Sequence, residues 1–157
     1  FISGTLAYIS PEQTGRINHR VEFSTDIYSL GIIFYQLLAG RLPFNSTDPL
    51  ELIHSHLAEE ALPVHELNPD VPSIVSDIIA KMCMKEPEKR YQTGAGLYAD
   101  IRYCADECLR NKQVEPFILG LHDHTRRVIF ISKMGNNFFI KHFNASHTIF
   151  MFYTWKI

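Results

Sequence analysis

Two pairs of histidines have the spacing that first suggests metal chemistry. His54 and His56, and later His122 and His124, each form a His-x-His pair, and the imidazole ring is a common metal ligand. On a helix, residues two apart point to different faces, so His54 and His56 cannot easily share one ion. The sequence places no third cluster of ligands beside either pair. We therefore predict that the chain has no metal site.

The three cysteines are the side chains with redox or nucleophilic potential. Cys83, Cys104 and Cys108 form an odd set without a Cys-x-x-Cys pair, which is typical of a reducing compartment rather than a disulfide framework. Cys104 and Cys108 share one helix face at i and i+4, but the same face carries the apolar Leu97 and Ile101. We predict that these two are core cysteines and that the chain is cytoplasmic.

The composition bounds the kind of protein and its partners. The chain of 157 residues is 46% hydrophobic and 20% charged, as in ordinary globular proteins with a single core. Its formal net charge of -2 gives no basic field that would attract nucleic acid. No run of about eighteen or more apolar residues occurs. We predict neither a nucleic-acid partner nor a membrane span.

The elements that must position any site are helical. The first 23 residues read as a loop with one short helical turn after Pro11. The strongest pattern predicts a helix that begins with Ser24 or Thr25 as its N-cap and stops at Gly40. Apolar residues occupy nearly every face of this helix. We therefore expect it to be central and buried.

Further helices follow over residues 48–60, 72–84 and 96–110. Asp48 should cap the first of them, with Pro49 at its first position and Glu51 completing a capping box. Pro87 cannot continue a helix, so residues 85–93 are predicted to be a loop. No hairpin pattern occurs before residue 120, and this part of the chain is predicted to be mainly α.

Four motifs follow one another in order along residues 4–110. They are "GTLAYISPE", "DIYSLG", "LPF" and the proline-containing loop "KEPEKRY". Together they resemble the C-terminal lobe of a eukaryotic-type Ser/Thr protein kinase. "SPEQTGR" and "DPLELIHSHLA" further resemble the kinase module at the front of large signalling proteins that also contain ATPase-like, sensor and histidine kinase regions. The resemblance implies a partial kinase domain over 1–120, built as a helical bundle.

The resemblance gives roles to five residues. Thr5 and Tyr8 match substrate-binding positions: the family threonine bonds to the catalytic aspartate and lysine, and the tyrosine props the substrate-docking loop against the lobe. Glu12 matches the glutamate of the Ala-Pro-Glu motif, and Arg90 its arginine partner, a buried pair that costs about 3–5 kcal/mol to break from one side. Asp26 matches an aspartate that accepts amide bonds from the catalytic loop. None of these positions is catalytic or binds a cofactor.

The resemblance also implies which functional groups are missing. The sequence begins inside the activation segment, so we expect that the glycine-rich loop, the phosphate-pairing lysine, the catalytic base and the magnesium-binding aspartate lie upstream. The intact parent would use ATP and Mg²⁺ to phosphorylate protein substrates. Phosphoryl transfer needs nucleotide, metal and base held together. Without its N-lobe in cis, this chain is expected to be inactive and to bind ATP poorly.

Two other interpretations remain open. The parent domain could be a pseudokinase that acts as a scaffold or regulator, and its upstream catalytic-loop and Asp-Phe-Gly aspartates would decide this. The chain could also be a helical interaction protein that folds and binds a partner alone.

The composition changes near residues 120–124. From His124 onward the chain has no Asp or Glu but many aromatic residues, so we treat 121–157 as a divergent, irregular tail that at most forms a makeshift hairpin. A membrane-surface segment and a partner-binding segment are both conceivable. The poor periodicity favours a third interpretation, in which the deduced reading departs from the coding frame.

Overall fold

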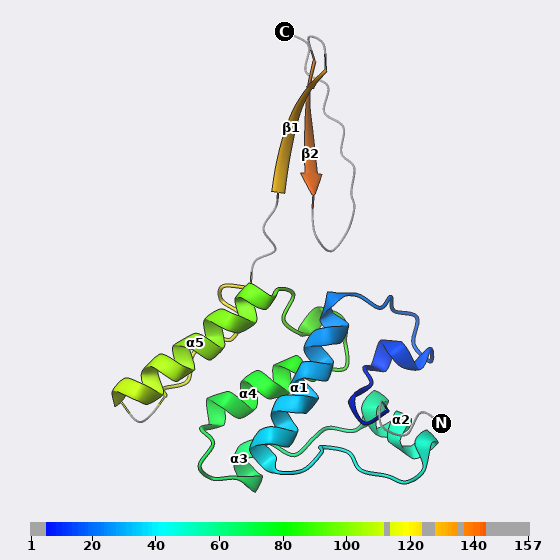
Figure 1. Cartoon of the computed structure of the whole chain (residues 1–157), viewed down its shortest axis with the longest axis vertical. Coiled ribbons are helices and arrows are strands. Elements are labelled where there is room, and N and C mark those ends of the chain that lie inside the picture. The colour runs from blue at the N-terminus through cyan, green and yellow to red at the C-terminus, as the bar shows by residue number, and fades with distance from the viewer. Residues whose placement is uncertain (1–5, 112–113, 124–127, 135–136, 144–157) are drawn as a thin grey trace. The chain divides into compact units, whose positions relative to one another are not determined.

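The computed structural model describes residues 6–111, 114–123, 128–134 and 137–143 (Figure 1). They belong to two compact units, Phe1–Asp123 and His124–Ile157. The described residues of the first unit form helices α1 to α5 and three short 3-10 turns, and those of the second form strands β1 and β2. The prediction of a mainly α chain is confirmed.

Helix α1, Phe23–Ala39, is the element against which the first unit is built. It ends at Gly40, whose φ of 72° is the left-handed conformation that glycine adopts readily. Its start was predicted wrongly: Glu22 is the N-cap, and Thr25, inside the first turn, accepts a hydrogen bond from the Glu22 amide at 3.3 Å. The helix begins earlier than predicted because Thr25 lies inside its first turn and stabilises that turn by this hydrogen bond.

The expectation that α1 is buried on nearly every face was also wrong. Ile27, Tyr28 and Ile32 are buried, but Leu37 is 72% exposed and Ile33 41% exposed. The exposed residues Ile33 and Leu37 lie on one strip of α1, whereas residues on its other faces pack against the core or bond to Tyr8.

The remaining helices are α2 (Pro49–Ala58), α3 (Val64–Leu67), α4 (Ser73–Met82) and α5 (Gly94–Asn111), and the 3-10 turns are η1 (Leu6–Tyr8), η2 (Pro11–Thr14) and η3 (Pro87–Lys89). Asp48 caps α2 as predicted, accepting the Leu50 amide at 2.8 Å. Its capping box is not formed, because Glu51 instead accepts the Ser46 hydroxyl at 2.6 Å. Helix α3 was not predicted.

Helix α4 packs against both α1 and α5 (Figure 1). The main core cluster joins Ile27 of α1, Ile78 and Met82 of α4 and Leu97 of α5. Gly31 lets α1 and α4 approach closely, because a Cβ at this position would lie 2.7 Å from Cys83 Sγ. The absence of a side chain at Gly31 is therefore a packing requirement.

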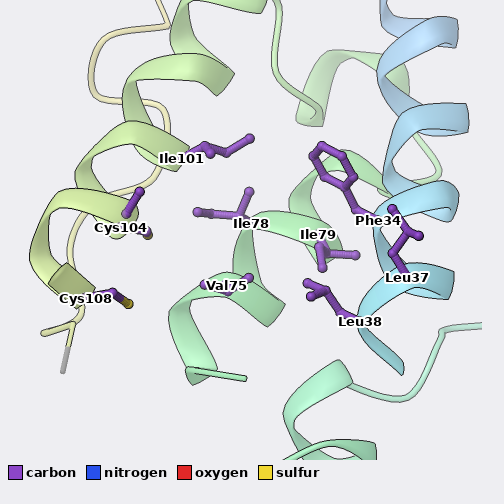
Figure 2. A pocket seen from close by; sticks show the side chains of 10 residues that line it. Phe34, Leu37, Leu38, Val75, Ile78, Ile79, Ile101, Cys104 and Cys108 are labelled. Atoms are coloured by element: carbon purple, nitrogen blue, oxygen red, sulfur yellow. The ribbon is translucent and has the colours of Figure 1, made fainter. Parts of the chain in front are cut away.

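An apolar groove of about 360 Å³ runs between α1, α4 and α5 (Figure 2). It is lined by Phe34, Leu37, Leu38, Val75, Ile78, Ile79, Ile101, Cys104, Ala105 and Cys108. All three cysteines are free thiols. Cys104 is a buried core residue, as predicted, whereas Cys108 is half-buried at the edge of this groove.

The second unit contains one described pair of strands. β1, Val128–Met134, pairs antiparallel with β2, Asn137–Phe143, in a register that sets Val128 opposite Phe143. The sequence predicted an irregular tail with at most a makeshift hairpin. Over the described ranges of both units, no helix combines the length and apolarity needed to cross a bilayer.

Candidate functional site

The candidate site is the anchored loop, which we define as residues 6–14. It consists of the turns η1 and η2, separated by a short extended step. Pro11 begins η2 because its fixed φ suits the first helical position, and Gln13 Oε1 accepts both the amide and the hydroxyl of Ser10 at 3.1 Å. Gly15, with φ of 67°, ends the turn. Local bonds therefore give the loop its shape.

A buried ion pair fastens the anchored loop to a distant part of the chain. Arg90 Nη1 donates to Glu12 Oε1 at 2.7 Å and Arg90 Nη2 donates to Glu12 Oε2 at 2.9 Å. Both side chains are 0% exposed. This bidentate geometry is the strongest form of a guanidinium–carboxylate contact. The structure thus brings together the two residues that the resemblance to kinases paired.

Thr25 completes the environment of the Glu12 carboxylate. Its hydroxyl donates to Glu12 Oε1 at 2.7 Å. Burial alone would raise the pKa of Glu12, but the hydrogen bonds from Arg90 and Thr25 outweigh it and hold the pKa below the usual value of 4.5. Glu12 is therefore a buried carboxylate that stays charged.

Arg90 uses its remaining donors to hold two further segments, the first turn of α1 and residues 84–85. Nε donates to Met84 O at 2.7 Å, Nη1 to Ser24 O at 2.9 Å and Nη2 to Lys85 O at 3.0 Å. The guanidinium also lies 4.9 Å above the Tyr28 ring, at a distance typical of a cation–π contact. Every N–H of the guanidinium is donated to a protein acceptor, so it has no free donor for a phosphate and acts as a structural bridge.

The other predicted residues have different placements. The Tyr8 hydroxyl donates to Gln36 Oε1 at 2.8 Å, and Ser29 Oγ donates to the Tyr8 carbonyl at 2.9 Å, so Tyr8 ties the anchored loop to α1. Asp26 is exposed in the first turn of α1. Thr5 lies outside the described residues. The roles that the resemblance gives to Thr5, Tyr8 and Asp26 stay predictions.

A second buried contact, not predicted from the sequence, fixes α2. His56 is 0% exposed, and its Nδ1 lies 2.9 Å from the Tyr28 hydroxyl. Burial, with a smaller contribution from the charge of Lys85, lowers the pKa of His56 to about 4. Lys85 Nζ donates to Ser55 O at 3.2 Å and to His56 O at 3.0 Å, which satisfies carbonyls at the end of α2.

Lys85 is also partly desolvated. Its Nζ lies 4.7 Å from the centroid of the Phe44 ring, and burial lowers its pKa to about 8. One local pattern indicates the burial of His56: it follows Leu52 at i+4, which puts both on the same, apolar face of α2. In the segments that the structure describes, no three His, Cys, Asp or Glu side chains gather as metal ligands.

Comparison with known proteins finds a family model and several relatives that are all protein kinases. Residues 2–112 match the family model of the protein kinase domain. The chain is 52% identical over 147 residues to the hybrid signal transduction histidine kinase G of Dictyostelium discoideum, covering 81% of this chain and 4% of that protein. It is 37% identical over 106 residues to the serine/threonine-protein kinase PrkC of Bacillus subtilis, covering 67% of this chain and 16% of the relative.

A third relative is the peroxide stress-activated histidine kinase mak3 of Schizosaccharomyces pombe. It is 36% identical over 102 residues, which cover 65% of this chain and 4% of the relative. The chain thus spans only a small part of the length of the curated relatives it matches, between 4% and 16% for these three.

Proposed function

Because the chain belongs to the protein kinase family and has the mainly α fold of that family's C-terminal lobe, we propose that it is the substrate-docking part of a Ser/Thr kinase domain. The observation that carries the proposal is the buried bidentate contact between Glu12 and Arg90. In the parent domain, the anchored loop would hold a protein segment while its Ser or Thr hydroxyl receives the γ-phosphate of ATP.

Two observations support the proposal that nucleotide and metal bind elsewhere in the parent. The Arg90 guanidinium has no unused donor, and this part of the chain holds no group of three metal-ligating side chains. We therefore assign ATP and Mg²⁺ to other parts of the parent domain and propose that the 157 residues alone are inactive. The role of this chain's own residues is to bind and orient the protein substrate.

The apolar groove supports the proposal that more of the domain packs here. Leu37, on its rim, is 72% exposed, and exposure of such a continuous apolar surface is costly in a finished domain. The relatives are many times longer than the matched segment. We propose that other helices of the same kinase domain, including those that precede residue 1 in the parent, cover this groove.

A role in signalling and a cytoplasmic location belong to the same proposal. Two of the relatives are named as histidine kinases, one for signal transduction and one for peroxide stress. Three free thiols suit a reducing compartment. The parent would accordingly be a large cytoplasmic signalling protein in which a Ser/Thr kinase domain accompanies other domains.

The test measures phosphate transfer from γ-labelled ATP to a mixture of Ser- and Thr-containing proteins. The purified 157-residue chain should give no more labelling than a blank without protein. The parent polypeptide, with its upstream residues, should label the substrates, and Arg90→Met in that parent should abolish labelling. Transfer by the 157-residue chain would refute its proposed inactivity. A folded parent without activity would instead favour the scaffold interpretation.

A further inference from the structure

The last described residues of the first unit fold back onto the start of α5. Asp123 Oδ2 accepts the Gln92 amide at 2.6 Å, and its Oδ1 accepts the Thr93 amide at 2.8 Å and the Thr93 hydroxyl at 2.7 Å. The amides that precede and begin a helix lack partners within it and carry partial positive charge. The Thr93 hydroxyl itself caps α5 by accepting the Gly96 amide at 2.9 Å, and the Asp123 carboxylate, 30 residues away, holds Thr93 in place.

A second carboxylate holds the other end of the same turn. Asp100, which lies on α5 and is 2% exposed, accepts the Gly120 amide at 2.7 Å and the Tyr91 hydroxyl at 2.6 Å. The Asp123 amide closes the turn by donating to Gly120 O at 3.0 Å. Gly120 has a φ of 77°, a left-handed conformation that favours glycine.

The start of α5 is shaped to receive this turn. A Cβ at Gly96 would lie 2.5 Å from both Cβ and Oδ1 of Asp123, so only glycine permits the approach. Upstream of the turn, the Phe117 ring packs edge-to-face on Tyr103 of α5, with centroids 4.7 Å apart. The segment 114–123 is therefore held along its length by aromatic packing and at its end by two carboxylates.

From this geometry we infer that Gly120–Asp123 is an exit latch, which fixes the end of the helical lobe to the N-terminus of α5. The latch makes the order of segment 114–123 depend on α5 and on two carboxylates, those of Asp100 and Asp123. Its hydrogen bonds use no atom of Glu12 or of the Arg90 guanidinium, and it requires no kinase activity. In a longer protein, the latch would determine where the chain leaves the lobe, and releasing it would free that segment without unfolding the lobe.

Hydrogen exchange of the whole 157-residue chain tests the latch. Asp123→Ala removes the acceptor of the Gln92 and Thr93 amides, so exchange at both should accelerate about tenfold or more. The Gly120 amide donates to Asp100, and it should accelerate as well because the segment that carries it is released. Exchange in the anchored loop should stay the same. The matched control is His122→Ala, because His122 is exposed and adjacent, and it should leave all these rates unchanged.

A second variant covers the case in which Asp123→Ala fails to fold. In an ordinary helix, Gly→Ala is stabilising, but Gly96→Ala should speed exchange at Gly120 because it pushes Asp123 away from α5. Unchanged exchange at Gly120 in Asp123→Ala would overturn the latch, because it would show that the segment stays in place without the Asp123 carboxylate. A uniform acceleration over the whole chain would do the same, because it would show a global effect rather than a local release. If Asp123→Ala does not fold, unchanged exchange at Gly120 in Gly96→Ala overturns it.

Discussion

Replacing Glu12 with glutamine is the change that most clearly separates a buried anchor from an incidental contact. The substitution keeps the size of the side chain but removes its charge, so Arg90 remains buried without a counter-charge. The glutamine amide also brings a donor toward one of the two guanidinium nitrogens that now meet a carboxylate oxygen at 2.7 and 2.9 Å. Breaking a buried pair from one side costs about 3–5 kcal/mol.

That magnitude is large compared with the stability of a typical domain. Domains unfold with about 5–15 kcal/mol, and both partners here are 0% exposed, so solvent gives little compensation. The Arg90→Met variant should be equally damaging, because Ser24, Met84 and Lys85 lose the hydrogen bond that each carbonyl now accepts. The double variant should cost less than the sum of the two, since neither charge is then left alone.

Urea denaturation followed by far-UV circular dichroism measures these costs on the 157-residue chain. Glu86→Gln is the matched control: Glu86 contacts Lys89 at 3.0 Å, but both side chains are more than half exposed, so the urea midpoint should not move. If Glu12→Gln shifts the midpoint no more than this control does, the reasoning about the buried pair is refuted.

Three further predictions concern packing, capping and pH. Gly31→Ala should cost about 1–3 kcal/mol in thermal unfolding, because the new methyl would meet Cys83 Sγ at 2.7 Å; Cys83→Ala in the same chain should restore part of the loss. Asp48→Ala should cost about 1 kcal/mol in urea unfolding, because the Leu50 amide loses its acceptor; an unchanged midpoint would contradict the cap. Stability should fall as the pH drops from 6.5 toward 4, because the unfolded chain protonates His56 while the folded chain, with a pKa of about 4, does not; His56→Gln should flatten this slope in a pH series of urea midpoints.

Local sequence signals account for most of the helices. Asp48 followed by Pro49 places the start of α2, and Gly40 places the end of α1. The start of α1 could not be predicted from local signals. Thr25 is the type of residue that caps helices, but its hydroxyl accepts the Glu22 amide and donates to the distant Glu12 carboxylate. Helix α3 has only four residues, too few to show a period.

The contacts of the site depend on long separations in the sequence. Glu12 and Arg90 are 78 residues apart, and only the ordered kinase motifs connected them before the structure was known. The only local sequence feature of the exit latch is Gly96. The need for glycine at this position follows from the close approach of Asp123, which is known only from the structure. His56 was read as one half of a histidine pair, whereas its burial against Tyr28 follows from tertiary packing.

The most direct test of the proposed anchor is the NMR titration of the Glu12 side-chain carboxyl carbon in the folded chain. If Arg90 and Thr25 hold this carboxylate as described, its pKa lies below 4.5 and rises when Arg90 is replaced with methionine in a variant that remains folded. A Glu12 pKa at or above 4.5 that does not respond to the loss of Arg90 would contradict the account of the anchored loop.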